Sequence, residues 1–202
     1  NEDGLVAAYN ANPKNVQGGK CLDVSGNENH GTINGVLIGK DGMCFYGGAN
    51  DGVIISYDDS LVGMEKLTIL ASIKPSDFSN TYYAIVNNWD SGSFNYFLWL
   101  KDKKIRFWVS TVDNPTGSEF VADTELILNE WNQIGIVYDG TEVVPYLNGE
   151  LDSESSLEVT GAVRSNNNPL DIGSTSQYSN YTFKGCIGEV KIYNRALSEQ
   201  EI

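Results

Sequence analysis

The stretch WNQIGIVYDGTEVVPYLNG, residues 131–149, decides the fold class of this 202-residue chain. Apolar residues recur at every second position on both sides of Asp139-Gly140, over 131–138 and again over 142–148. A period of two is typical of a strand with one buried face, and an Asp-Gly pair between two such strands favours a tight turn. Residues 131–149 are therefore predicted to form an antiparallel β-hairpin.

The same pattern extends outward along the chain in both directions. Strands are expected at 4–9, 33–38, 42–46, 52–56, 67–74, 82–89, 94–101, 104–110, 118–123, 131–138, 142–148, 169–173 and 183–193. No long helical period is present to connect parallel strands, so an all-β fold is predicted, an antiparallel two-sheet β-sandwich of the jelly-roll type. The whole chain, 1–202, is expected to form a single domain. One helical turn is expected at its end, with Ser198 as N-cap and Glu201 in the capping-box position.

The chain is strongly acidic, with a formal net charge of −14. Its 13 Lys and Arg are outnumbered by 27 Asp and Glu, which does not fit a nucleic-acid-binding protein. An anionic lipid surface would repel the chain, and no apolar run reaches about 18 residues, so membrane insertion is not expected. The acidity fits a secreted protein that binds cations or neutral ligands, and it fits plain solubility equally well.

The cysteines and the first residue bear on the cellular context. Cys21, Cys44 and Cys186 show no CxxC spacing, so a zinc site is not expected, and their odd number leaves at least one thiol unpaired within the chain. The chain starts at Asn1 with neither an initiator Met nor a signal peptide. We expect a module of a larger multidomain protein that is extracellular or attached to the cell surface.

Three stretches together resemble a known family. They are Asp23–Gly31 (DVSGNENHG), Trp131–Gly149 and Phe183–Ile202 (FKGCIGEVKIYNRALSEQEI). In this order they are similar to laminin-G-like domains of the concanavalin A-like lectin/glucanase superfamily. The resemblance implies a sandwich in which residues 5–9 lie beside 185–193, and it implies a structural calcium ion. It implies no single ligand, because this fold hosts lectin-like modules, adhesins and enzymes.

The resemblance also indicates which residues would hold the calcium ion (Ca²⁺). Asp23 and Glu189 are the expected charged ligands, and Asn27 and His30 are expected to contribute backbone carbonyls, since calcium takes about 6–8 oxygen ligands. One departure weakens this site: the family usually has Asp-Glu where this chain has Gly188-Glu189. The alternative is an ordinary turn in which Asp23 and Ser25 hydrogen-bond to their own backbone. Because residues 5–9 and 185–193 are brought together, Cys21–Cys186 is the expected disulfide.

The strands between 82 and 110 carry the candidate ligand-binding face. Alternation places one set of residues on a core face: Ala84, Val86, Leu98, Leu100, Ile105, Phe107 and Val109. The opposite face carries Asn87, Trp89, Asn95, Phe97, Trp99, Arg106 and Trp108. Indole rings suit the apolar face of a sugar, and amide and guanidinium groups suit its hydroxyls, so Asn87, Trp89, Trp99, Arg106 and Trp108 are the candidate ligand-binding residues. The alternative is that a loop covers the tryptophans, which then form a second small core.

An enzymatic alternative rests on Glu150, Asp152 and Glu154, which have the form E-x-D-x-E. In the related glucanases such a run places its acids on one strand face, as a retaining mechanism requires. Here the run follows the Asn148-Gly149 turn without the apolar residues that bury it in those enzymes, which favours a solvated hairpin edge. The lone His30 lies in a turn, so a Ser-His-Asp arrangement is not expected.

The sequence therefore predicts a non-catalytic carbohydrate-binding or adhesion module with a structural calcium ion. Its expected partner is a carbohydrate or cell-surface glycan. Two alternatives stay open. One is a glycan-active enzyme, either a hydrolase that uses Glu150, Asp152 and Glu154 or a lyase, and the other is a spacer or protein-interaction domain.

Overall fold

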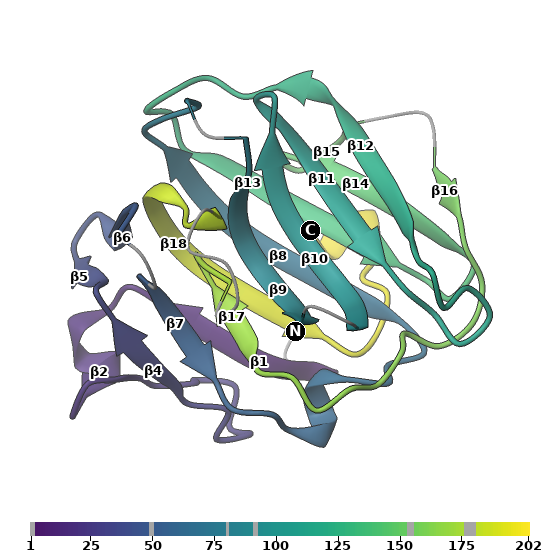
Figure 1. The fold of residues 1–202 in the computed structure, drawn as a ribbon, viewed down its shortest axis with the longest axis horizontal. Coiled ribbons are helices and arrows are strands. Elements are labelled where there is room, and N and C mark those ends of the chain that lie inside the picture. Colours follow the sequence, from purple (N-terminus) through teal and green to yellow (C-terminus); the bar gives the residue numbers. More distant parts are fainter. Residues whose placement is uncertain (1–2, 49–50, 80, 91–92, 153–155, 176–180) are drawn as a thin grey trace.

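The computed structural model describes residues 3–48, 51–79, 81–90, 93–152, 156–175 and 181–202. These residues form a nearly all-β fold of two antiparallel nine-stranded sheets, which confirms the predicted fold class (Figure 1). Short 3₁₀ helices occur at η1 (Pro13–Asn15), η2 (Asp59–Leu61) and η4 (Glu199–Glu201). No helix in the described part of the chain is long and apolar enough to cross a membrane.

The first sheet, called sheet 1, contains both ends of the chain. Its strands are β1 (Leu5–Asn10), β5 (Leu37–Gly39), β6 (Gly42–Tyr46), β8 (Leu67–Pro75), β13 (Asn132–Tyr138), β14 (Glu142–Leu147), β15 (Glu150–Leu151), β16 (Leu157–Glu158) and β18 (Lys184–Tyr193). They lie in the order β15-β14-β13-β8-β18-β6-β5, with β1 paired to β18 and β16 to β14. The predicted hairpin is present as β13–β14.

The second sheet, called sheet 2, carries the predicted aromatic face. Its strands are β2 (Val16–Gln17), β3 (Lys20–Cys21), β4 (Gly31–Asn34), β7 (Gly52–Ile55), β9 (Tyr83–Asp90), β10 (Ser93–Lys101), β11 (Lys104–Val109), β12 (Ser118–Glu125) and β17 (Leu170–Ile172). They lie in the order β12-β11-β10-β9-β17-β7-β4-β3-β2.

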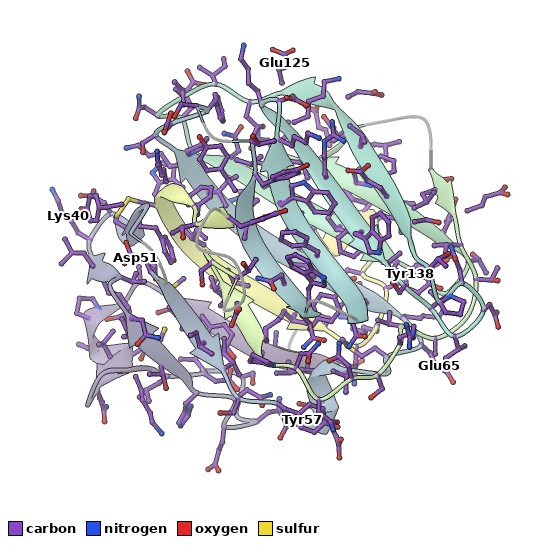
Figure 2. All side chains as sticks on the ribbon, in the orientation of Figure 1. Lys40, Asp51, Tyr57, Glu65, Glu125 and Tyr138 are labelled. Carbon is purple, nitrogen blue, oxygen red and sulfur yellow. A yellow bond between two sulfur atoms is a disulfide. The ribbon has the colours of Figure 1, made fainter. Side chains whose placement is uncertain are left out.

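Buried side chains from strands of both sheets form one hydrophobic core. Figure 2 shows the side chains of the described residues on the ribbon. The largest fully buried side chains of this core are Tyr9, Tyr83, Tyr96, Tyr138, Phe45, Phe107, Phe183, Met43, Ile55, Leu61, Leu67 and Ile69. Aromatic and branched side chains dominate strands because they pack well on a pleated surface. The core thus holds the sheets face to face and leaves their outer faces for other contacts.

The ends of the chain are joined as the resemblance implied. β1 pairs antiparallel with β18, from Leu5 opposite Tyr193 to Asn10 opposite Glu189. The terminal turn is also confirmed, because Ser198 and Glu201 form a capping box at η4. Both ends of the fold therefore lie at the same end of this strand pair.

Two sequence-based assignments are wrong. The strand expected at 33–38 is divided between β4 and β5, because Gly35 adopts a positive φ of 62° in the turn between them. Ala84 was assigned to the main core, but it packs with the tryptophans outside it. The register between β9 and β10 shifts at Leu98/Trp99, so Leu98 faces Val86 while Trp99 faces Ala84. A β-bulge of this kind breaks the alternation on which the assignment relied.

The expected Cys21–Cys186 disulfide is also wrong, since Cys44 is bonded to Cys186. The two cysteines lie directly opposite each other on the neighbouring strands β6 and β18. Cys21 is buried with a free thiol, and burial, aided by the nearby charge of Asp23, raises its pKa to about 11. The bond therefore links two strands of sheet 1, and Cys21 stays in the core.

The loop after β3 is attached to β1 through the carboxylate of Asp23, which is only 7 % exposed. Its Oδ1 accepts hydrogen bonds from Ala8 N at 2.8 Å and Ser25 N at 2.9 Å. Its Oδ2 accepts from Ser25 Oγ at 2.7 Å and Asn29 N at 3.1 Å. A carboxylate has about four lone-pair positions, so all of its acceptor capacity is used within the protein.

The disulfide gives a prediction about stability. Removing it with Cys44→Ser should lower the free energy of unfolding by up to about 5 kcal/mol, because a 142-residue loop is no longer closed in the unfolded chain. Denaturant titration of the two proteins measures the difference. Thiol labelling without reductant supplies the control: wild type should react only after denaturation, and Cys21→Ser should not react at all. Rapid labelling of the native wild type would contradict the assignment.

The hydrogen bonds of Asp23 give a second prediction. Asp23→Asn should destabilise the protein by about 2–3 kcal/mol in calcium-free buffer, because an amide supplies one acceptor oxygen and leaves buried donors unpaired. Asp41→Asn, at an exposed turn position, is the matched control and should change little. An Asp23→Asn variant as stable as the wild type in urea would show that these bonds do not hold the loop.

Candidate functional site

The predicted aromatic face lies on the outer side of sheet 2, where its central rings form a stack. The rings of Trp89 and Phe97 lie 5.7 Å apart with an interplanar angle of 17°, and those of Phe97 and Trp99 lie 4.6 Å apart at 24°. Trp89 and Trp99 are only 8 % and 6 % exposed, and with Ala84 they form a hydrophobic cluster separate from the main core. These two tryptophans therefore belong mainly to a second small core, as in the alternative stated for this face from the sequence.

Half-buried aromatic rings form an accessible rim above this stack. Tyr82 and Tyr181 stack on each other with centroids 4.8 Å apart, and Lys101 Nζ lies 4.9 Å from the Tyr82 centroid. Trp108 on β11 lies directly opposite Phe97 on β10. Together they surround a hollow of about 290 Å³, lined by Tyr82, Trp89, Phe97, Trp99, Lys101, Trp108, Glu119 and Tyr181. We call it the aromatic hollow.

The polar residues predicted for this face are placed differently. Asn87 is fully buried and donates its amide hydrogen to the Ser174 carbonyl, so it does not reach the hollow. Arg106 is half-buried and forms ion pairs with Glu119 at 3.0 Å and Asp102 at 3.3 Å, which neutralise its charge. Trp99 Nε1 is buried and has no hydrogen-bond partner among the residues that the structure describes. A buried donor without a partner is uncommon and costs free energy.

The side chains of the four expected calcium ligands make contacts within the protein, whereas Asn27 and His30 are expected to bind calcium through their backbone carbonyls. Asp23 uses its carboxylate oxygens as described above, and Asn27 donates its amide to the carbonyls of Leu5 and Val6. His30 Nδ1 accepts a hydrogen bond from Asp23 N, and the carboxylate of Glu189 lies 2.9 Å from Lys191 Nζ.

In this arrangement a calcium ion between Asp23 and Glu189 would have to replace the donors bound to Asp23 and the ammonium group beside Glu189. The described residues also contain no group of three or more His, Cys, Asp or Glu side chains placed to hold a metal. Calcium binding here remains a prediction.

The acids of the enzymatic alternative lie at an edge of sheet 1. Glu150 is exposed on the edge strand β15, and Asp152 accepts hydrogen bonds from the backbone of Asp123 and Thr124. Glu154 lies outside the described residues. Asp152 thus acts as a link between the loop after β15 and β12, and neither it nor Glu150 lines the aromatic hollow.

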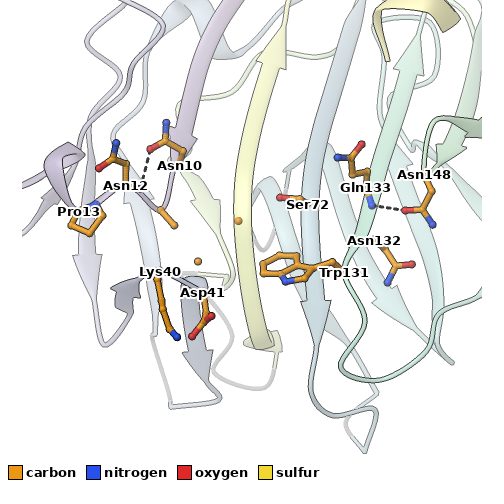
Figure 3. A pocket seen from close by; sticks show the side chains of 13 residues that line it. Asn10, Asn12, Pro13, Lys40, Asp41, Ser72, Trp131, Asn132, Gln133 and Asn148 are labelled. Carbon is orange, nitrogen blue, oxygen red and sulfur yellow. Dashed lines mark hydrogen bonds between the residues drawn. The ribbon is translucent and has the colours of Figure 1, made fainter.

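A second and larger hollow, of about 860 Å³, lies on the outer side of sheet 1 (Figure 3). Trp131, just before β13, is 45 % exposed and is one of its walls. Amide side chains surround it, from Asn10, Asn12, Asn132, Gln133 and Asn148. Sequence reasoning missed this group, and the one available signal was the unusual Gly188, which also lines the hollow.

Solved structures with the same fold come from larger proteins. The binding domain of Paraclostridial Mosquitocidal Protein 1 aligns with 99 % of this chain and 51 % of its own, at a TM-score of 0.76 and 21 % identity. The botulinum neurotoxin serotype D ligand binding domain in complex with N-acetylneuraminic acid aligns with 99 % of this chain and 50 % of its own, at a TM-score of 0.77 and 18 % identity. Trypanosoma rangeli sialidase in complex with a difluorosialic acid aligns with 98 % of this chain and 32 % of its own, at a TM-score of 0.72 and 15 % identity. At these identities the likeness shows the fold alone.

The sequence itself matches a family over most of its length. No curated protein matches the chain. The family described as the concanavalin A-like lectin/glucanases superfamily matches residues 47–202, which include the β13–β14 hairpin and β18 but not the Asp23–Gly31 loop. Since more than half of the chain is matched and the two-sheet sandwich agrees, the chain belongs to the concanavalin A-like lectin/glucanases superfamily.

Proposed function

We propose that this chain is a non-catalytic carbohydrate-binding module that holds a neutral glycan in the aromatic hollow. The observation that carries the proposal is the rim of Tyr82, Trp108 and Tyr181, half-buried rings fixed on a stacked base. Aromatic rings that remain accessible beside polar groups provide flat surfaces on which the C–H face of a pyranose can stack. A rigid base also lowers the entropic cost of binding, because the rings are already in place.

Polar groups at the hollow suit hydroxyls better than charged ligands. Lys101 and Glu119 both line it, so the hollow carries one group of each sign, and Glu119 is in addition paired with Arg106. The whole chain carries a net charge of −14, which disfavours anionic sugars by repulsion. The neurotoxin domain crystallised with N-acetylneuraminic acid supports sugar binding by this fold, whereas the charge of this chain favours a neutral sugar.

A binding role agrees with the position of the acids. Glu150 is exposed at a sheet edge, and Asp152 is occupied by backbone donors, so neither is placed beside the accessible aromatic rings. A retaining glycosidase needs two carboxyl groups on either side of the scissile bond, about 5–5.5 Å apart. We therefore infer that the module binds its glycan without cleaving it.

We also propose that the module belongs to a larger protein outside the cytoplasm. The chain spans about half the length of the toxin domains and about a third of the sialidase. The Cys44–Cys186 disulfide supports an extracellular or cell-surface location, because disulfides form and persist in oxidising compartments. Adhesion through a cell-surface glycan is the role that such a module would serve.

The proposal predicts the effect of removing one rim indole. Trp108→Ala should weaken glycan binding by about 1–3 kcal/mol, because it removes the accessible indole surface of the rim on which a sugar ring would stack. A glycan array with neutral and sialylated members identifies the ligand, and calorimetry measures the change. Tyr46→Ala, an aromatic truncation at a 69 % exposed position on β6, is the matched control and should bind as the wild type does.

Trp99→Ala would be less informative, because removing a buried indole costs stability of about 3–5 kcal/mol as well as any contact with the ligand. Absence of binding to every glycan on the array would contradict the proposal and favour a spacer or protein-interaction domain. Binding that survives Trp108→Ala unchanged would place the ligand elsewhere.

Calcium binding by Asp23 and Glu189 is proposed from the family resemblance alone and needs its own test. If the ion binds, calcium should raise the thermal midpoint of the wild type by mass action, and it should have no effect on Asp23→Ala. Scanning calorimetry with calcium and with a chelator makes the comparison, and Asp41→Asn serves as the control that keeps the response. Equal midpoints for the wild type in both buffers would leave the hydrogen bonds of Asp23 as the stabilising contacts of this loop.

A further inference from the structure

The large hollow on sheet 1 is built around an indole that lies on a glycine. A Cβ placed on Gly188 would lie 3.3 Å from Cη2 and Cζ3 of Trp131, so the six-membered part of the indole covers this position. The same Cβ would lie 2.6 Å from Ser72 Oγ, a separation that real Cβ atoms do not show. Gly188 therefore allows Trp131 to rest against β18, while 45 % of the residue remains exposed.

This glycine is the departure from the family pattern noted in the sequence. With the usual Asp at position 188, the side chain would collide with Ser72 and would place a carboxylate against the indole. The backbone here is also irregular, because the register between β18 and β8 shifts between Ile187 and Val190, and Glu189 N donates to Ser72 Oγ at 2.9 Å. Because Gly188 replaces that Asp, the expected calcium site lacks one carboxylate, and the indole of Trp131 has room to lie against β18.

Three amides around Trp131 each have their side-chain oxygen occupied by a hydrogen bond within the protein. Asn10 Oδ1 accepts hydrogen bonds from Asn12 N and Asn15 Nδ2, Asn12 Oδ1 accepts from Lys14 N, and Asn148 Oδ1 accepts from Gln133 N (Figure 3). Their oxygens are therefore occupied, and within the described part of the chain none of the three Nδ2 groups has an acceptor. The rim thus presents amide donors, which suit the oxygens of a hydroxylated ligand.

Charge narrows the class of ligand. Lys40 and Asp41 are neighbours at the β5–β6 turn, and they add one charge of each sign to a rim that is otherwise uncharged. The net charge of −14 disfavours an anionic ligand, and an exposed indole with amide donors is a poor site for a hydrated metal ion. An indole for the apolar face of a ring and amide donors for its oxygens together suit an uncharged pyranose.

We propose that the hollow around Trp131 is a second saccharide site, specific for neutral pyranosides and independent of the aromatic hollow. The two sites lie on the outer faces of opposite sheets, since Trp131 belongs to the sheet 1 side and the aromatic cluster is separate from the core between the sheets. One module can then contact two glycan chains, and on a glycan-coated surface the second contact adds avidity without any new protein interface.

Fluorine NMR of protein labelled with 5-fluorotryptophan tests the proposal, because the chain contains four tryptophans and Trp131→Phe identifies the resonance of Trp131. The probes are neutral tetrasaccharides of glucose, galactose and mannose, with sialyllactose as the charged comparison. At least one neutral probe should shift the Trp131 resonance saturably, and sialyllactose should not. The shift should persist in Trp108→Ala, which disables only the aromatic hollow.

Trp131→Ala should weaken binding of the active probe at least about tenfold in calorimetry of the Trp108→Ala background, where only this site is left. Gly188→Asp should do the same, and if that variant does not fold, Gln133→Ala removes one lining amide at an exposed strand position instead. No shift of Trp131 with any neutral probe would overturn the proposal, and so would a shift that disappears in Trp108→Ala. Both results leave the test of the aromatic hollow intact.

Discussion

The whole structure depends on how β18, the last strand, is inserted into the middle of sheet 1. One edge of β18 pairs with β8 along most of its length. Its other edge is shared, since residues 184–187 pair with β6 and residues 189–193 pair with β1. The strands on either side of β18 therefore lack a pairing partner until β18 has taken its place between them. The sandwich is therefore held together by contacts between residues that are far apart in sequence, which are slow to form and cooperative once formed.

Local patterns were sufficient to predict most strands and the class of the fold. The β13–β14 hairpin was predictable because alternation and an Asp-Gly turn occur together in one short segment. Errors arose where the chain departs from regular geometry: a turn at Gly35 divides one expected strand, and a bulge moves Ala84 to the other face. The disulfide was mispredicted because pairing of Cys44 with Cys186 depends on the register between β6 and β18, which no local pattern specifies.

The candidate sites were predictable only in part, and for a similar reason. Alternation placed Trp89, Trp99 and Trp108 on the correct face, but it carries no information about what covers that face. Tyr181, which follows β17, packs against the cluster and helps to bury the indole of Trp89. The hollow around Trp131 is assembled from β1, the β5–β6 turn, β8, β13 and β18, so none of its segments identifies it alone. The role of Asp23 could not be predicted because a metal-binding loop and a hydrogen-bonded turn require the same residue types. Only the atoms that contact the Asp23 carboxylate in the structure distinguish the two.

The Cys44–Cys186 bond has a mechanical consequence. If tension reaches the domain through its two ends, it first acts on β1 and β18, whose outer ends, Leu5 and Tyr193, lie side by side. When two antiparallel strands are pulled apart from the same end, their hydrogen-bonded pairs break one after another, so a low force separates them. The disulfide then stops the separation, because it connects the chain across 142 residues and shields everything between the two cysteines from the load. Only residues 1–43 and 187–202 can extend. A pulled domain would therefore extend by no more than the length of these two end segments, because the load passes through the disulfide and does not act directly on β9, β10 and β11.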